Sequence, residues 1–192
     1  MDTGKDFVGT AKNDLFVASD AGATPTNAWS VADTIDGGKG KDGLTIVTGL
    51  AAGVITADFA NNTMKSIEIV DINATAGAIN LDTTQAGKVA ENFKAVTDLE
   101  LTTSGTGTID VIGGKNIVAK AAAAGATTVT VGNAAKTVTV NSTNKNAVIL
   151  KGTTAVTKVI ATGTGENALT LNTLINVKEF DGSAATGGID LT

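Results

Sequence analysis

Residues Ile35–Ile46, with the sequence IDGGKGKDGLTI, join a glycine-rich turn to the start of a strand. Within them, Gly37–Thr45 matches every fixed position of the nine-residue pattern G-G-x-G-x-D-x-U-x, in which U is a large apolar residue. That residue, Leu44, is expected to point inward and fill the core between stacked coils. The stretch therefore predicts an all-β protein, a parallel β-solenoid of the β-roll or β-helix type with calcium-binding turns at its N-terminal end.

The spacing of this nonapeptide continues toward the N-terminus. Asp33 lies nine residues before Asp42. Ile35 lies nine residues before Leu44. Further upstream, Gly9–Val17 (GTAKNDLFV) has a glycine, an aspartate and an apolar residue at the corresponding positions. We interpret both segments as degenerate coils that keep one phase with the complete repeat.

Aspartates and glycines in this pattern suit a calcium site. Ca²⁺ takes about six to eight oxygen ligands from carboxylates and backbone carbonyls in a flexible cage. Glycines allow a turn tight enough for its carbonyls to face the ion. Bound ions would offset the repulsion between the carboxylates, so metal binding and folding are expected to be coupled. The candidate metal-binding residues are Asp14, Asp33, Asp36, Gly37, Lys39 and Asp42.

Two further points concern this turn. Lys39 and Lys41 occupy variable positions of the repeat, so their side chains are expected to point to solvent. Aspartate and glycine also favour bends without any ion, so a plain turn is the alternative interpretation of the motif.

From Ile109 onward, pairs of apolar residues recur at intervals of nine to eleven residues. Such intervals leave no room for helical crossovers, so successive strands must be hairpins of a meander or coils of a parallel solenoid. The turns lack the Asn-Gly and Asp-Gly signals of two-residue hairpins, which favours the solenoid. A β-sandwich is the alternative fold. The pairs expected to face inward are Val129/Val131, Val138/Val140, Val148/Leu150, Val159/Ala161 and Leu169/Leu171.

Two regions are expected along the chain. Residues 1–49 form a calcium-binding module with strands at Leu15–Ala18 and Leu44–Thr48, separated by a loop at Asp20–Ser30. Residues 50–192 are rich in Thr, Ala and Val and form a solenoid region that is expected to be continuous with the first module.

The second region begins with less regular patterns. A strand is expected at Ile67–Ile72. A short helix is expected at Gln85–Val96, because Ala86, Val89, Phe93 and Val96 have helical spacing. We expect this helix to brace a sheet.

The composition argues against an enzyme. The chain has 192 residues, of which 42% are hydrophobic and 3% aromatic, and it contains no His, Cys, Tyr or Arg. These residues supply the usual acid or base, the strongest common nucleophile and the bidentate clamp for anions. A β-helical polysaccharide lyase would have only lysine as its base. Carboxylates of Asp71, Asp98 and Glu100 could be paired for hydrolysis, but they alternate with apolar residues as on a solvated strand face.

Charge and hydropathy exclude other classes. The net charge of −5 and the lack of a basic patch argue against nucleic-acid binding. Apolar runs fall short of the roughly eighteen residues that cross a bilayer, so membrane insertion is not expected. The motifs Thr128/Thr130 and Thr137/Thr139 could start an ice-binding ladder, but the next pair, Ala147 and Ile149, interrupts it.

These residues carry a family resemblance. The segments GTAKNDLFVAS and DTIDGGKGKDGLTIV resemble the opening of calcium-binding RTX-type regions in bacterial surface-layer (S-layer) proteins. The phrases MKSIEIVDI and NVKEFDGSAATGGIDLT are similar to those that punctuate the Thr/Ala/Val-rich repeats of the same family. One nonapeptide is complete, whereas heavily calcium-loaded RTX blocks carry several in tandem. Large RTX adhesins contain the same kinds of sequence motif.

The resemblance implies a structural, non-enzymatic protein at the surface of a Gram-negative cell. It would be exported by type I secretion and would assemble with Ca²⁺ into a two-dimensional lattice through homotypic contacts. Lipopolysaccharide would be bound, if at all, through other parts of the full protein. We expect the chain to be a fragment of a larger protein, because it starts and stops in mid-pattern and lacks the family's C-terminal secretion signal. A segment of a type I-secreted RTX adhesin is the alternative.

Overall fold

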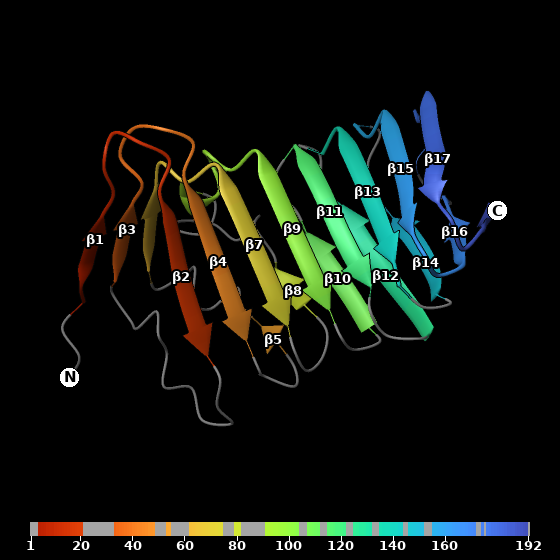
Figure 1. Ribbon diagram of the computed structural model, residues 1–192, viewed down its shortest axis with the longest axis horizontal. Helices are drawn as coiled ribbons and strands as arrows, with labels where there is room; N and C mark the ends of the chain where they lie inside the picture. Colours follow the sequence, from red (N-terminus) through yellow and green to blue (C-terminus); the bar gives the residue numbers. More distant parts are fainter. Residues whose placement is uncertain are drawn as a thin grey trace.

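The structure is a computed structural model of the chain, and it describes residues 4–20, 33–48, 53–54, 62–74, 79–81, 91–103, 107–111, 115–121, 125–131, 135–143, 146–151, 155–171, 174 and 176–191. Eighteen strands lie within these ranges and form three sheets (Figure 1). Sheet A has three strands, in the order β1 (Asp6–Val8), β3 (Thr34–Asp36) and β6 (Thr63–Lys65).

Sheet B is the largest and has eight strands. From one edge to the other they are β17 (Glu179–Ala185), β15 (Lys158–Gly163), β13 (Thr137–Ser142), β11 (Asn116–Ala121), β9 (Asp98–Thr103), β7 (Ile69–Ala74), β4 (Gly43–Thr48) and β2 (Leu15–Asp20). Figure 1 shows them side by side along the whole length of the molecule. The predicted modules at residues 1–49 and 50–192 therefore contribute to one unbroken sheet.

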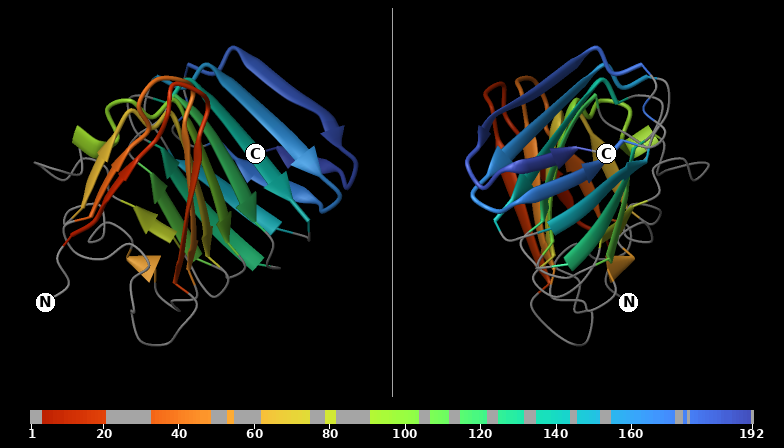
Figure 2. Two further views of the ribbon diagram at one scale, coloured as in Figure 1. Left: turned by 60° about the vertical axis from the view of Figure 1, so that its left-hand side comes forward. Right: turned by 90° about the vertical axis from the view of Figure 1, so that its right-hand side faces the viewer.

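Sheet C has seven strands and faces sheet B (Figure 2). In order they are β18 (Ile189–Leu191), β16 (Asn167–Thr170), β14 (Asn146–Lys151), β12 (Gly125–Val131), β10 (Gly107–Val111), β8 (Ile79–Leu81) and β5 (Gly53–Val54).

The strand pairings of all three sheets are parallel. Consecutive strands belong to different sheets, so the chain winds from sheet to sheet and returns one coil further along. This arrangement confirms the predicted parallel β-solenoid. The alternative β-sandwich is excluded, because its sheets would be built from antiparallel neighbours.

The intervals of nine to eleven residues in the sequence correspond to half of a coil. In sheet B, Ile117, Val138, Val159 and Phe180 are register partners at steps of 21 residues. Apolar pairs that follow each other in the sequence therefore face one another across the core instead of stacking. For the same reason the threonine motifs form no ladder: Thr128/Thr130 lie in β12 of sheet C, and Thr137/Thr139 lie in β13 of sheet B.

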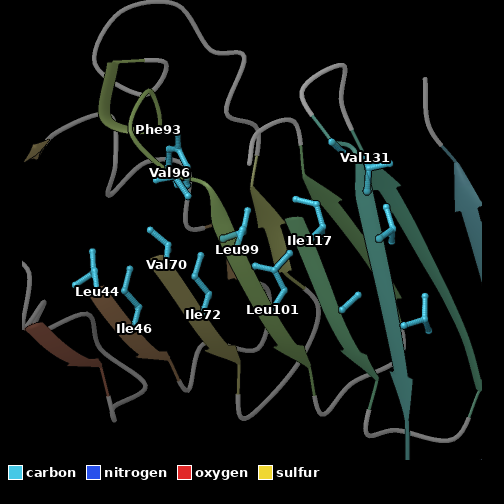
Figure 3. Packing of buried hydrophobic residues seen from close by; sticks show 14 of the residues in the cluster. Leu44, Ile46, Val70, Ile72, Phe93, Val96, Leu99, Leu101, Ile117 and Val131 are labelled. Carbon is cyan, nitrogen blue, oxygen red and sulfur yellow. The ribbon is translucent and has the colours of Figure 1, made fainter. Parts of the chain in front are cut away.

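The core consists of columns of inward-facing residues, one from each coil. Figure 3 shows the labelled side chains of sheet B pointing into the space between the sheets. Burying one such Val, Leu or Ile stabilises the fold by about 1.5–3 kcal/mol. The first column of sheet B is Phe16, Leu44, Val70, Leu99, Ile117, Val138, Val159 and Phe180.

The predicted inward pairs agree with this core where their side chains are described. Val138/Val140 and Val159/Ala161 are buried, as are Val131 and Leu169, whereas Leu171 is partly buried. The side chains of Val129, Val148 and Leu150 lie outside the described part of the structure.

The strand and loop predictions of the first half are shifted in places. The predicted strand at Leu15–Ala18 extends to Asp20, and the one at Leu44–Thr48 begins at Gly43. The strand predicted at Ile67–Ile72 spans Ile69–Ala74, because Ile67 and Glu68 form a corner before it. The loop predicted at Asp20–Ser30 lies, after Asp20, outside the described residues.

A short helical segment ends sheet A. Glu91 and Asn92 are helical, and the helix ends there, earlier than the predicted Val96; residues 85–90 lie outside the described part. The Asn92 side chain takes the place of a further strand beside β6. Its Oδ1 accepts a hydrogen bond from the backbone N–H of Met64 at 2.7 Å, and its Nδ2 donates to the carbonyl of Asn62 at 3.0 Å. Phe93 and Val96 lie beyond the two helical residues and are buried in the core, so they do not form the bracing helix that was predicted.

Candidate metal centre

Three turns stack at the corner where sheet A meets sheet B (Figure 2). Residues 9–14 join β1 to β2, residues 37–42 join β3 to β4, and residues 66–68 join β6 to β7. The turns approach so closely that a Cβ on Gly37 would overlap the carbonyl oxygen of Ser66. Gly38 and Gly40 have φ of +87° and +137°, which favour glycine. The glycines of the nonapeptide are therefore needed for the turn to fold against its neighbours.

Asp42 is the central carboxylate of this corner. It is completely buried, with 0% of its surface exposed. Its Oδ1 accepts a hydrogen bond from the backbone N–H of Asp14 at 2.7 Å. Its Oδ2 is buried and has no hydrogen-bond partner in the structure. A buried polar atom that lacks a partner costs about 1–3 kcal/mol, and more for a charged group, so this oxygen is suited to bind a cation.

Asp14 repeats the arrangement one coil earlier. Its Oδ2 accepts hydrogen bonds from the backbone N–H and the hydroxyl of Thr10, at 2.6 and 2.9 Å. A Cβ on Gly9 would lie 3.0 Å from the same Oδ2 and would overlap the carbonyl oxygen of Gly37. In the next coil, a Cβ on Gly37 would lie 2.7 Å from Asp42 Oδ2. Both coils therefore place one carboxylate oxygen beside a glycine and the next coil's carbonyl.

Glu68 is the corner residue of the third coil. The register pairs Leu15 with Gly43 and Gly43 with Ile69, so Glu68 precedes its strand as Asp14 and Asp42 do. Its Oε2 accepts a hydrogen bond from the backbone N–H of Asp42 at 2.8 Å. The strand predicted at Ile67–Ile72 would have placed Glu68 within a strand and not at a corner. The corner role is hidden because the third turn has three residues in place of six, which breaks the nonapeptide spacing.

Asp33 lies at the opposite end of β3 from Asp42. Three strand residues separate Asp33 from the turn, which corresponds to about 10 Å. Its Oδ1 accepts a hydrogen bond from the backbone N–H of Lys5 at 2.7 Å, and its own N–H donates to Asn62 Oδ1 at 3.2 Å. With Asn92 it forms a buried polar ladder along the other end of sheet A. Asp33 therefore has the nine-residue spacing of the repeat relative to Asp42, but it does not lie at the same corner.

The remaining candidates lie at the surface of the turn. Asp36 ends β3, and its Oδ1 accepts a hydrogen bond from the backbone N–H of Gly38 at 3.1 Å. Lys39 is exposed, as expected, and its backbone N–H donates to the carbonyl of Thr10 at 3.2 Å. Lys41 is also exposed, and its Nζ lies 2.7 Å from Oδ2 of Asp98.

The structure thus brings Asp14, Gly37 and Asp42 to one corner and adds Ser66 and Glu68. Asp33 is apart from them. Within the described residues, no group of three or more acidic side chains is close enough to hold a metal ion by itself. A cation at this corner would therefore need backbone carbonyls in addition to carboxylates, as the hard oxygen cage of Ca²⁺ allows.

A second acidic group lies on the outer face of sheet B. Asp71 and Glu100 are direct register partners on β7 and β9, and Lys120 makes an ion pair with Glu100. Partial burial, together with the nearby Glu100 carboxylate, raises the pKa of Asp71, although Lys120 opposes this. Hydrogen bonds from Asn116 and Lys41 lower the pKa of Asp98. As predicted, Asp71, Asp98 and Glu100 are placed by the register on an outer strand face; they are partly exposed.

The chain matches no family model, no curated protein and no solved structure. Among the described residues, no helix has the length and apolar character required to cross a membrane.

Proposed function

We propose that this chain is a structural segment of a calcium-dependent, self-assembling S-layer protein on the surface of a Gram-negative cell. It is exported by type I secretion, it is not an enzyme, and it acts through homotypic lattice contacts. Other parts of the full protein provide any attachment to lipopolysaccharide. The proposal is based on the sequence motifs, and the geometry of the turn corner supports the part of it that concerns calcium binding.

The residues at the corner fit a calcium ion. Asp42 offers its unpartnered Oδ2, with the carbonyl oxygen of Ser66 close by, and the carbonyl oxygen of Gly37 lies near Asp14 Oδ2 one coil earlier. Asp14 and Glu68 add negative charge in the coils on either side of Asp42. When bound, Ca²⁺ supplies positive charge between the stacked acidic corners. The backbone N–H groups of Asp14 and Asp42 hold the carboxylates of the following coil in place for it.

A single observation carries this proposal: the completely buried Asp42 has one oxygen without a donor. In a chain without Arg and His, that oxygen has few alternatives to a metal ion or a water molecule as its partner. Lys41, the adjacent cation, is directed to Asp98 instead. Carboxylate and carbonyl oxygens together favour Ca²⁺ over softer metals.

The test is thermal unfolding followed by circular dichroism in excess Ca²⁺, in excess Mg²⁺ and in chelator. We expect Ca²⁺ to raise the midpoint of the wild-type chain and Mg²⁺ to raise it less. Asp42→Asn keeps the shape of the side chain but removes its charge, and it should abolish most of the calcium-dependent gain. Asp190→Asn, a charge change at an exposed residue of β18, is the matched control and should keep that gain. An unchanged wild-type midpoint in chelator would contradict the calcium component.

The elongated solenoid also suits the stalk of a type I-secreted RTX adhesin (Figure 1). Both functions use stacked coils stiffened by calcium, so folding experiments do not separate them. Electron microscopy of the chain with Ca²⁺ does: two-dimensional arrays favour the S-layer protein, and isolated extended rods favour the adhesin.

A further inference from the structure

One corner of sheet B has a different charge at its two ends. The residue that precedes each strand of this sheet forms a column, because the strand starts are register partners from Leu15 to Glu179. The first three positions are acidic and three of the last four are lysines. In order from β2 to β17 the column is Asp14, Asp42, Glu68, Thr97, Lys115, Lys136, Thr157 and Lys178.

A ladder of backbone hydrogen bonds runs along this column. The carbonyl of Asp14 accepts from the N–H of Gly43 at 2.9 Å. Further along, the carbonyl of each corner residue accepts from the next coil, as the Thr157 carbonyl does from the N–H groups of Lys178 and Glu179 at 2.9 and 3.2 Å. The ladder therefore has a direction: the carbonyls of the corner residues point toward the C-terminal end of the solenoid, and the N–H groups of the strand-start residues that donate to them point toward the N-terminal end.

The N-terminal end of the solenoid presents an apolar edge. Among the described residues, β2 pairs on one side only, with β4. Leu15 and Val17 on this strand are 69% and 66% exposed, and Phe7 and Val8 on β1 are 40% and 73% exposed. Phe16 and Ala18 line a hollow of about 260 Å³ at the same end. An edge strand with no charged side chain over Leu15–Ala18 is prone to pair with another strand.

The C-terminal end is complementary. In the described part of the chain, β17 pairs on one side only, with β15, and it begins directly after the exposed Lys178. Glu179–Asp181 are in regular register, before the irregularity in the β15–β17 pairing. Phe180 ends the same inward column that Phe16 begins. Lys178 occupies at this end the column position that Asp14 occupies at the other end.

We propose that this chain docks head to tail with a second copy of itself, with β17 of one copy pairing in parallel with β2 of the next. The pairing continues sheet B across the junction and places Phe180 beside Phe16 of the following copy. It sets Lys178 against Asp14, and Asp181 against Val17. The N–H of Leu15 then faces the carbonyl of Lys178, as the ladder requires. The contact is heterologous and joins opposite ends of the solenoid, so its repetition extends the molecule into a polar fibre.

The inference deepens the proposed self-assembly and rests on it, since it names the surfaces through which the copies meet. It also sets a register, which gives a sharp test. Val17→Glu places a carboxylate opposite Asp181 and should weaken association at least about tenfold. Val17→Lys places an ammonium there and should retain it. Lys178→Glu should weaken association by a similar factor, because it faces Asp14 across the junction.

Sedimentation velocity in excess Ca²⁺ over a range of concentrations measures the association. Wild-type chain and Val17→Lys should form concentration-dependent oligomers that dissociate at high salt, since the paired charges are screened. Lys136→Glu makes the same charge change in the middle of the column and serves as the matched control, with wild-type association expected. Circular dichroism of each variant verifies its fold before sedimentation.

Mixing two variants tests the head-to-tail arrangement. Val17→Glu retains a functional C-terminal end, and Lys178→Glu retains a functional N-terminal end. Each alone should be monomeric, and an equimolar mixture should form a dimer that grows no further. A symmetric contact between two N-terminal ends would instead leave Lys178→Glu dimeric and make Val17→Lys as defective as Val17→Glu. That result, or a wild-type chain that stays monomeric at every concentration, overturns the proposal.

The two proposals fail in different ways. If calcium is not bound, the chain keeps its fold in chelator, and sedimentation of that folded chain still measures the docking. If the docking is wrong, the calcium-dependent gain in thermal midpoint persists in a chain that remains monomeric.

Discussion

The first three coils and the last four coils contribute strands to the same sheet, but they have different side chains at the corner that precedes each strand. In the first three, Asp14, Asp42 and Glu68 occupy the corner, and side-chain carboxylates accept the backbone N–H of the preceding coil. The backbone ladder runs through both regions. In the later coils the carbonyl of Lys115 accepts from the N–H groups of Lys136 and Thr137 in the following coil at 2.8 and 3.2 Å, and lysine or threonine stands where the first coils have an acidic side chain. The comparison teaches that the carboxylate contacts belong to the corner side chains and not to the solenoid fold, so the proposed metal dependence should be confined to the first three coils.

The largest effect is expected from closing the space between the stacked turns of the first coils. Gly37→Ala would push a methyl group into the carbonyl of Ser66, which is backbone and cannot move aside. We expect a loss of about 2–4 kcal/mol in the free energy of unfolding, measured by urea titration.

Gly43→Ala is the matched control for this substitution. The nearest atom to its new methyl group is Leu15 Cδ1 at 3.3 Å, the end of a flexible side chain. Its effect should stay below about 1 kcal/mol. Equal losses for both variants would mean that the tight stacking of the acidic corners is not special to Gly37.

A smaller effect is expected where the two regions meet. Asn92 ends sheet A, whose three strands among the described residues all belong to the first coils. Asn92→Ala leaves the N–H of Met64 and the carbonyl of Asn62 without these partners and should cost about 2 kcal/mol by urea titration.

Asn13→Ala removes an amide of the same size at an exposed position, where Oδ1 accepts from the N–H of Lys41 at 3.0 Å. Water can replace that contact, so its cost should be less than half that of Asn92→Ala. A cost for Asn92→Ala no greater than that of Asn13→Ala would show that the end of sheet A does not depend on the Asn92 side chain.

The smallest effect concerns the outer face of sheet B and has the opposite sign. The folded chain raises the pKa of Asp71, so its ionised form is less favourable there than in the unfolded chain. Its contribution to stability is fully present below the ordinary pKa of about 4 and is lost as pH rises through the raised value. Asp71→Asn should therefore stabilise the chain by about 0.5 kcal/mol at pH 7 and not at pH 3.

The opposite pH dependence is expected for Asp98, whose pKa is lowered by Asn116 and Lys41. Its contribution is present above the ordinary pKa and is lost as pH falls through the lowered one. Asp98→Asn should thus destabilise the chain at pH 7, and urea titrations of both variants at the two pH values compare them directly. A destabilised Asp71→Asn at pH 7 would contradict the unfavourable environment assigned to that carboxylate.

The solenoid could be predicted from the sequence because two independent signals agreed. The nonapeptide Gly37–Thr45 requires stacked tight turns, and the apolar pairs after Ile109 recur too often for any helical connection. The pairing of strands could not be read from this rhythm. An interval of about ten residues fits a strand that stacks on the previous one and a strand that faces it, and the register decides between them.

The candidate site could be predicted only in part, because spacing in the sequence does not say which turns stack on one another. Asp42 and Asp14 share a corner because the two turns have equal length, six residues each. Asp33 keeps the same nine-residue phase, but strand β3 separates its position from their corner. Glu68 is absent from the phase because its turn is shorter. Asn62 and Asn92 give no pattern at all, since asparagine is as common in turns as in buried ladders.

Hydrogen exchange followed by mass spectrometry tests the central claim most directly, because it reports on the acidic and the lysine-bearing coils of sheet B separately. Amide protection is compared in Ca²⁺ and in chelator for peptides that cover β2 and β4 and for peptides that cover β13 and β15. We predict that chelation lowers protection strongly in β2 and β4 and weakly in β13 and β15. Equal protection of β2 and β4 in both conditions, or an equal loss along all four strands, would contradict a cation held at the acidic corner.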